Sequence, residues 1–154
     1  MTTLSLPNQS PAYALVEGLR ESASGVSIRR AAPDEWARDE LLLRKLGWKG
    51  WGRVCHFRNY YPPDWGENGR VLSPRALDAL FRFLEGASFP VGNTGPSVFL
   101  TDRGGIELCW EDRNGESVQV EFTGTGVEFY QAANDEEGTI GFDGLAELSR
   151  RLAA

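Results

Sequence analysis

Apolar and polar residues alternate along the chain from Ser97 to Tyr130, and short glycine-containing segments interrupt the alternation. A period of two is typical of a β-strand that buries one face and leaves the other in water. The pattern therefore predicts a β-meander, in which successive antiparallel strands are joined by tight turns. We expect its four strands at residues 97–101, 106–111, 117–122 and 127–131.

The alternation also predicts each turn, because residues directly opposite each other in an antiparallel pair share a face. A two-residue turn at Asn114-Gly115 would place Leu108 opposite Glu121, so we expect a three-residue loop with a left-handed glycine instead. The same argument predicts a three-residue loop at 102–104 and a two-residue type II′ turn at Gly124-Thr125. The resulting apolar pairs are Val98–Leu108, Leu100–Ile106, Trp110–Val118, Leu108–Val120, Ile106–Phe122, Phe122–Val127 and Val120–Phe129.

The wet face of this sheet is predicted to be acidic. Glu107 falls opposite Glu121, and Glu121 falls opposite Glu128, while Cys109, Gln119 and Tyr130 form the next row. Like charges opposite each other destabilise a sheet slightly. The row is then either a solvated surface or a site for a basic protein or a divalent metal. The candidate binding residues on this face are Phe99, Glu107, Glu111, Glu121, Glu128 and Tyr130.

Helical spacing of apolar residues follows and precedes the strands. Ser73 is a good N-cap for a helix at 74–85, whose stripe of apolar residues we expect to pack on the meander. Asp143 is expected to cap a C-terminal helix that ends at Arg150 and Arg151. The further expected elements are a helix at 11–22, an extended segment at 26–28, a helix at 33–46 ended by Gly47, and an edge strand at 139–141.

These elements predict an α+β fold: a four- to five-stranded antiparallel β-meander with helices packed on one face. A chain of 154 residues is long enough for one domain with a proper core. We expect a single domain over 1–154, with a flexible start at 1–10. A helical and aromatic part at 11–70 then precedes the helix, meander and C-terminal helix of 73–154.

Residues 48–70 differ in character from the rest, since they hold six of the chain's 17 aromatic residues together with four basic ones. We expect a long ordered loop here, with a short strand at 53–57. Its rings either wrap the edge of the core or stack on nucleobases or another planar ligand. The candidate binding residues in this segment are Trp51, Arg58, Tyr60, Tyr61 and Trp65.

Charge is distributed unevenly within the net charge of −6. Residues 102–147 hold 12 acidic and two basic side chains, so the acidity belongs to the sheet. Such a face repels nucleic acid and attracts basic partners. The sequence has no apolar run long enough to span a membrane and no secretory signal, and its two cysteines suit a reducing compartment. We therefore expect a cytoplasmic protein.

Few residues suggest catalysis. His56 is the single histidine, and no phosphate-binding loop, dinucleotide fingerprint, zinc motif or calcium loop is present, so no cofactor is expected. The glutamate row could hold Mg²⁺ or Mn²⁺ for phosphodiester hydrolysis. A lysine that would hold water or phosphate near such a metal is missing, because no lysine follows Lys49.

The run from Asp64 to Gly69, the Ser73-Pro74 helix start, the segment Gly104–Trp110 and Val120-Glu121-Phe122 together resemble a group of small uncharacterised bacterial proteins. The resemblance covers about residues 60–130 and implies a helix followed by an antiparallel hairpin sheet. Its motifs are turn glycines, a helix cap and a core tryptophan, and it implies no activity.

These observations predict a non-enzymatic binding protein whose acidic sheet face docks a basic protein partner, of the antitoxin, immunity or anti-defence inhibitor type. Two alternatives stay open: a metal-dependent phosphodiester hydrolase that uses the glutamate row, and a nucleic-acid or ligand binder that uses residues 48–70. Neither a catalytic residue nor a definite metal ligand is predicted. The oligomeric state is left open, although the edge at 97–101 could pair with another copy.

Overall fold

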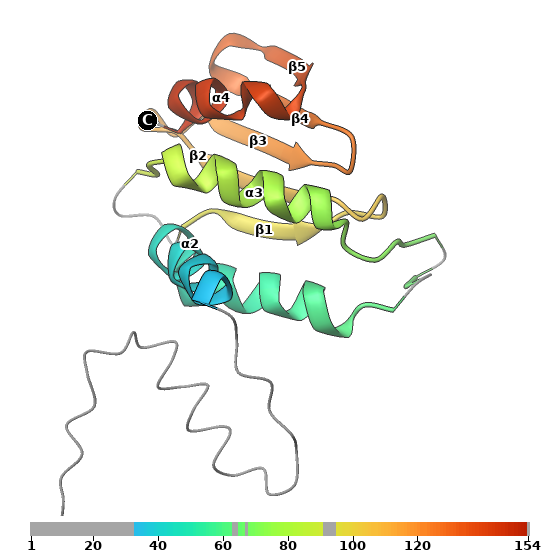
Figure 1. Cartoon of the computed structure of the whole chain (residues 1–154). Coiled ribbons are helices and arrows are strands. Elements are labelled where there is room, and N and C mark those ends of the chain that lie inside the picture. The colour runs from blue at the N-terminus through green and yellow to red at the C-terminus, as the bar shows by residue number, and fades with distance from the viewer. Residues whose placement is uncertain (1–32, 63–64, 67, 91–94, 154) are drawn as a thin grey trace, which may run out of the picture. The chain divides into compact units, whose positions relative to one another are not determined.

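The computed structural model of the chain describes residues 33–62, 65–66, 68–90 and 95–153 (Figure 1). The chain divides into two compact units, Met1–Glu40 and Leu41–Ala154. The predicted flexible start at 1–10, the helix at 11–22 and the extended segment at 26–28 lie outside the described residues. The single domain over the whole chain therefore stays a prediction.

Helix α2 (Pro33–Tyr60) begins in the first unit and runs into the second. Gly47 interrupts it with a φ of 70° and a ψ of −179°, so the predicted helix at 33–46 and its end at Gly47 are confirmed. The loop and short strand predicted beyond that point are wrong, because residues 48–60 are helical. Val54 and Phe57 lie three residues apart and are buried, and this packing outweighs the low helix propensity of the nearby glycines.

The sheet contains five antiparallel strands in sequence order, which confirms the predicted α+β meander. The register agrees with the prediction at every apolar pair, for example Trp110 opposite Val118 and Val120 opposite Phe129. The strands are β1 (Ser97–Leu100), β2 (Ile106–Glu111), β3 (Ser117–Phe122), β4 (Val127–Gln131) and β5 (Glu136–Ile140).

The first two hairpin turns confirm the predicted three-residue loops, since Gly104 and Gly115 have φ values of 76° and 81°. The third turn keeps its predicted length of two residues, because the Thr123 N–H donates to the Gly126 carbonyl at 2.9 Å. The type II′ prediction is wrong, since Gly124 lacks the positive φ that this turn requires. Instead, Thr123 Oγ1 accepts hydrogen bonds from the N–H groups of Thr125 and Gly126.

Beyond β4 the chain differs from the prediction in two details. A 3₁₀ turn, η1 (Ala132–Asn134), leads into β5, which covers 136–140 instead of 139–141. A second 3₁₀ turn, η2 (Phe142–Gly144), runs directly into α4 (Leu145–Leu152). Asp143 is therefore inside η2, and α4 has no side-chain N-cap, which corrects the predicted capping role.

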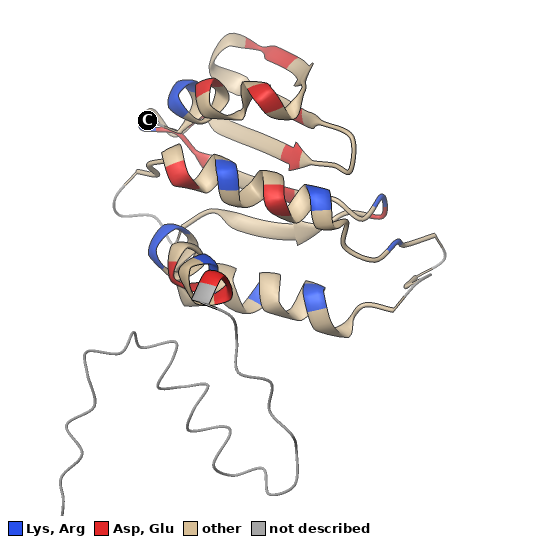
Figure 2. Ribbon diagram, viewed as in Figure 1, with Lys and Arg blue, Asp and Glu red and all other residues tan. Residues whose placement is uncertain are grey.

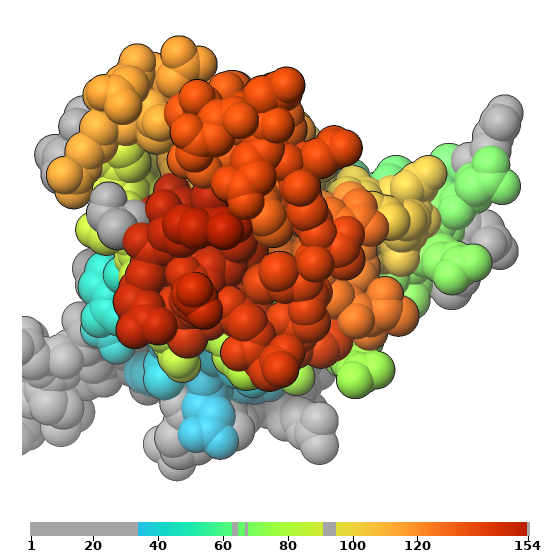
Figure 3. Space-filling view, turned by 90° about the horizontal axis from the view of Figure 1, so that it is seen from above, coloured from blue at the N-terminus to red at the C-terminus, as the bar shows by residue number. Residues whose placement is uncertain are grey.

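Helices α3 (Pro74–Gly86) and α4 both cover the apolar face of the sheet (Figure 1). The Ser73 hydroxyl accepts a hydrogen bond from the Ala76 N–H at 3.4 Å, which confirms the predicted cap of α3. The buried ring of Phe83 lies 5.3 Å from that of Phe122, measured between centroids. Viewed from above, the C-terminal residues pack directly against the last strands (Figure 3), where Arg151 pairs with Glu136 at 3.3 Å.

The second half of α2 contributes to the same core and lies beside β1. Val54 and Phe57 belong to the buried apolar cluster that contains the sheet and α3. The Arg53 guanidinium lies 5.2 Å from the centre of the Phe99 ring on β1. Cys55 and Cys109 are not joined to each other by a disulfide bond. Within the described residues, no helix combines the length and the apolar character needed to cross a membrane.

Candidate functional site

The face of the sheet opposite α3 and α4 carries the candidate binding residues, and we call it the open face. Alternation along the strands places the apolar side chains under the helices and leaves polar side chains on this second face. Gln119, Thr139 and the ring of Phe99 are exposed there. The glutamates of the open face are Glu107, Glu111, Glu121, Glu128 and Glu137.

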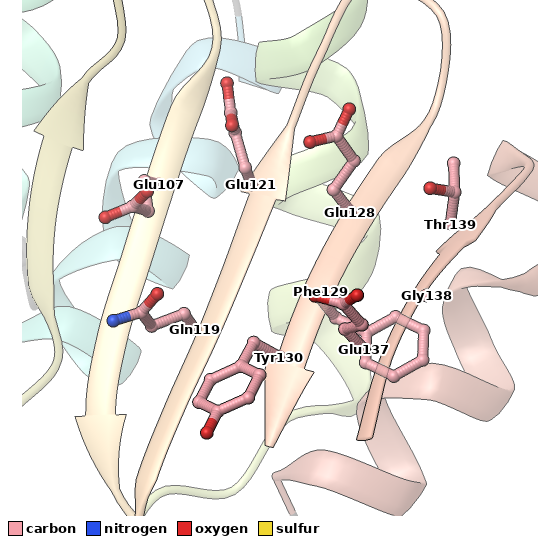
Figure 4. A pocket seen from close by; sticks show the side chains of 9 residues that line it. All are labelled: Glu107, Gln119, Glu121, Glu128, Phe129, Tyr130, Glu137, Gly138 and Thr139. Carbon is pink, nitrogen blue, oxygen red and sulfur yellow. The ribbon is translucent and has the colours of Figure 1, made fainter. Parts of the chain in front are cut away.

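Figure 4 shows how these side chains form two rows across the strands. Glu107, Glu121 and Glu128 are direct neighbours in register, as the sequence predicts. In the next row, Gln119 lies opposite Tyr130, and Tyr130 lies opposite Glu137 on β5. An open hollow of about 420 Å³ lies over both rows.

Arg103, from the turn between β1 and β2, lies across the end of the glutamate row. Its two terminal nitrogens donate to the two carboxylate oxygens of Glu128 at 3.0 and 2.9 Å. It also forms an ion pair with Glu121. The guanidinium therefore compensates the repulsion between two carboxylates that the sheet register places side by side.

This ion-pair network keeps Arg103 and Glu128 in their charged forms. The hydrogen bonds from Arg103 hold the pKa of Glu128 below its ordinary value, with burial acting in the opposite direction. The hydrogen bonds to Glu128 and then Glu121 raise the pKa of Arg103. Both charges are consequently present throughout the neutral pH range.

Glu121 depends on Arg103 more than Glu128 does, because its side chain is only 15% exposed compared with 46% for Glu128. Its Oε1 atom is buried and has no hydrogen-bond partner among the described residues. A buried carboxylate oxygen without a donor is costly unless a nearby cation compensates its charge.

Glu107, the third member of the row, accepts a hydrogen bond from Cys109. The Cys109 Sγ lies 3.1 Å from Glu107 Oε1. Burial raises the pKa of the Cys109 thiol to about 12, and the hydrogen bond to Glu107 adds to this effect. The raised pKa disfavours the thiolate, which is the nucleophilic form of the side chain.

The second predicted set of binding residues lies on α2 and on the segment after it, where the rings of Tyr61 and Trp65 contact each other with centroids 5.0 Å apart. Trp51 and Tyr61 are half-buried and pack against the core. Trp65 is half-buried and donates from Nε1 to the Arg70 carbonyl at 2.7 Å. Tyr60 is 72% exposed, and Arg58 is also exposed.

The described residues offer no ligand set for the metal-dependent alternative, because no group of three or more His, Cys, Asp or Glu side chains among them is placed to hold a metal ion. At the glutamate row, the guanidinium of Arg103 already supplies the positive charge. His56 is exposed and stacks on Tyr60, with ring centres 5.1 Å apart.

Two residues of the open face were absent from the predicted binding set. Arg103 was assigned only to a turn, although an arginine beside strands rich in glutamate is a signal for an ion pair. Glu137 lies outside the edge strand predicted at 139–141, because Glu136, Glu137 and Gly138 have low β-propensity. Pairing with β4 places this segment in the sheet and extends the acidic surface.

No protein-family model, curated protein or solved structure matches this chain. The resemblance to small bacterial proteins with a similar hairpin sheet therefore stays a prediction.

Replacing Arg103 with glutamine is expected to lower the free energy of unfolding at pH 7 by about 1–2 kcal/mol. It leaves Glu121 partly buried beside Glu107 and Glu128 without a cation. The pKa of Glu128 is lowered in the folded state, so this stabilisation is present above its unfolded pKa and disappears as the pH falls through the folded one. Urea unfolding of both proteins at a series of pH values measures the difference.

Arg113→Gln is the matched control for this prediction, because Arg113 is an exposed arginine in the next hairpin turn. It removes the same charge without touching the glutamate row. A specific ion-pair network would be contradicted if the two variants lost the same free energy of unfolding. It would also be contradicted if the loss in Arg103→Gln stayed the same in acid.

Proposed function

We propose that this protein is a non-enzymatic binding protein that docks a basic protein partner on its open face. The observation that carries the proposal is the set of five glutamates on a sheet face that none of the described helices covers, with Arg103 as a cation of the same face. An inhibitor of the antitoxin, immunity or anti-defence type uses such a surface to cover the basic surface of its target.

The helix side of the domain carries a different balance of charge from the open face, which supports a specific role for the negative charge of the open face. The outer side of α3 carries both signs, as Figure 2 shows, with Arg75, Asp78, Arg82 and Glu85 spaced along it. On the open face the excess is strongly negative. A surface of one sign steers an oppositely charged partner and makes the association rate fall with salt.

Aromatic side chains among the glutamates support a docking surface as well. Tyr130 lies in the second row between Gln119 and Glu137, and Phe99 lies opposite Glu107. Rings surrounded by polar groups are the usual anchors of protein interfaces. The arrangement of Arg103 on Glu128 also illustrates the two-point contact that an arginine of the partner would make with another glutamate.

The proposal places the protein in the cytoplasm, a reducing compartment that suits a chain with only two cysteines. The inhibitor would need no catalytic group and no cofactor.

A capture experiment with charge-reversal variants tests this function. Glu111→Lys with Glu137→Lys reverses two glutamates of the open face and leaves the Arg103 network intact. Tagged wild type and variant are incubated with native lysate at low salt, washed with rising salt, and the retained proteins are identified. We expect a basic protein that wild type retains, that salt releases, and that the variant loses at least tenfold.

The matched control is Glu85→Lys with Glu147→Lys, which makes the same charge change on exposed positions of α3 and α4. This control is expected to keep the partner. Equal loss from both double variants would show that net charge alone governs capture, and retention by both would remove the open face as the docking site.

A further inference from the structure

The second half of α2 presents one exposed face that the proposed docking function does not use. Lys49, Arg53, His56 and Tyr60 are spaced four, three and four residues apart, so they lie on the same side of the helix. All four side chains are exposed, whereas Val54 turns into the core. We call these four residues the α2 strip.

The α2 strip continues onto β1. Lys49 and Arg53 line a small hollow together with Pro96 and Ser97 at the start of this strand. The Arg53 guanidinium is held over the Phe99 ring, and Phe99 is 40% exposed. The cation of Arg53 is thus positioned by an aromatic ring and still faces water.

The two cations of the strip have no acidic partner among the residues that the structure describes. Arg103 and Arg151 each pair with glutamates, but neither Lys49 nor Arg53 forms an ion pair within the described part of the chain. Phe99, which lies under the Arg53 guanidinium, is opposite Glu107 on β2. Both cations are available to an anionic ligand.

The other half of the strip is a stack of two rings. His56 and Tyr60 lie nearly parallel, with centroids 5.1 Å apart and an angle of 24° between the rings. Tyr60 is 72% exposed, so most of its surface is open to a further planar group. An exposed ring stack beside lysine and arginine is the arrangement with which proteins hold unpaired nucleobases and their phosphates.

We propose that the α2 strip binds single-stranded nucleic acid, with phosphates on Lys49 and Arg53 and a base stacked on Tyr60. A single strand fits better than a duplex, because its bases are free to stack on protein rings. Glu107 and the rest of the open face repel phosphates, which confines the strand to the helix side of β1. The proposed contacts to the strand use none of the glutamates of the open face, although Phe99 borders both surfaces. The site does not depend on the protein partner.

The test is fluorescence anisotropy of a labelled oligothymidylate titrated with the full chain at several low salt concentrations. Wild type is expected to bind the single strand more tightly than a duplex of equal length. Lys49→Glu with Arg53→Glu is expected to weaken binding at least tenfold and to flatten its dependence on salt, since fewer counterions are released. Tyr60→Ala is expected to weaken binding about fivefold or more while the salt dependence stays unchanged.

Matched variants separate this site from general charge effects. Arg82→Glu with Arg150→Glu makes the same charge change on exposed positions of α3 and α4, and Tyr60→Phe keeps the ring. Both are expected to bind like wild type. The proposal is overturned if wild type does not bind the oligonucleotide at low salt, or if both charge-reversal pairs lose the same affinity. It is also overturned if heparin binds as tightly as the oligonucleotide and Tyr60→Ala leaves the affinity unchanged. The last result would indicate a site for polyanions in general.

Discussion

Replacing Phe83 with alanine is expected to lower the free energy of unfolding by about 3–5 kcal/mol. Phe83 is fully buried in α3, and its ring contacts Phe122 on β3 and Trp110 on β2, with centroid distances of 5.3 and 6.2 Å. The side chain therefore joins the helix to the centre of the sheet. Its removal loses apolar burial and leaves a cavity that the fixed strands cannot fill.

Urea unfolding followed by tryptophan fluorescence measures this loss. Phe99→Ala is the matched control, because it deletes the same side chain on the open face, where Phe99 is 40% exposed. We expect the control to cost less than about 1 kcal/mol. Equal losses at the two positions would contradict the placement of α3 against the centre of the sheet.

Replacing Gly104 with alanine is expected to cost about 2–5 kcal/mol, which is the second large effect. Gly104 has a φ of 76°, and an added Cβ atom would lie 2.4 Å from the backbone oxygen of Val71. The Gly104 carbonyl also accepts a hydrogen bond from the Ser73 N–H at 2.8 Å. The new methyl group would push the segment before α3 away from the first hairpin and strain the start of the helix.

Gly115→Ala separates backbone strain from this clash. Gly115 has a similar φ of 81°, but an added Cβ atom would meet nothing within 4 Å. We expect the control to cost about 1–2 kcal/mol, the price of a left-handed alanine alone. Thermal and urea unfolding of both variants measure the difference, and the Val71 contact is disproved if the two variants are equally stable.

Local alternation was sufficient to predict the sheet. In the first four strands each turn is short, so the parity of apolar positions leaves one register that buries a single face. Pairs such as Leu108–Val120 and Glu121–Glu128 follow from this parity, and both are confirmed. The type of the third turn was not predictable in this way, because the Thr123 hydroxyl closes it.

Local patterns failed where packing by distant elements decides the structure. Residues 48–60 read as a loop because of glycines and closely spaced rings, yet β1 and the core supply a surface on which this segment is helical. Likewise, helical spacing predicts a stripe of Leu77, Leu80, Phe81 and Leu84 on α3, whereas Phe83 is also fully buried. The sheet and α4 both contact this helix, so it buries a wider arc than a surface helix does.

The two candidate surfaces also contain features that local pattern predicts and features that it does not. The glutamate row follows from strand register and was predicted, whereas the position of Arg103 depends on a long side chain that crosses from a turn to two strands. The α2 strip depends on a helix that the sequence did not predict. Composition supplies the charges of the open face and of the α2 strip. Tertiary structure decides where Arg103, Lys49 and Arg53 lie relative to the sheet.

The sequence by itself determined the order of the strands, their register and the sign of charge on the open face, because each depends on neighbours within a hairpin. Only the tertiary structure decided which charged side chains form ion pairs within the protein and which can bind a ligand. That decision depends on contacts between residues far apart in the chain, such as Arg103 with Glu128 and Arg53 with Phe99, which no local pattern encodes.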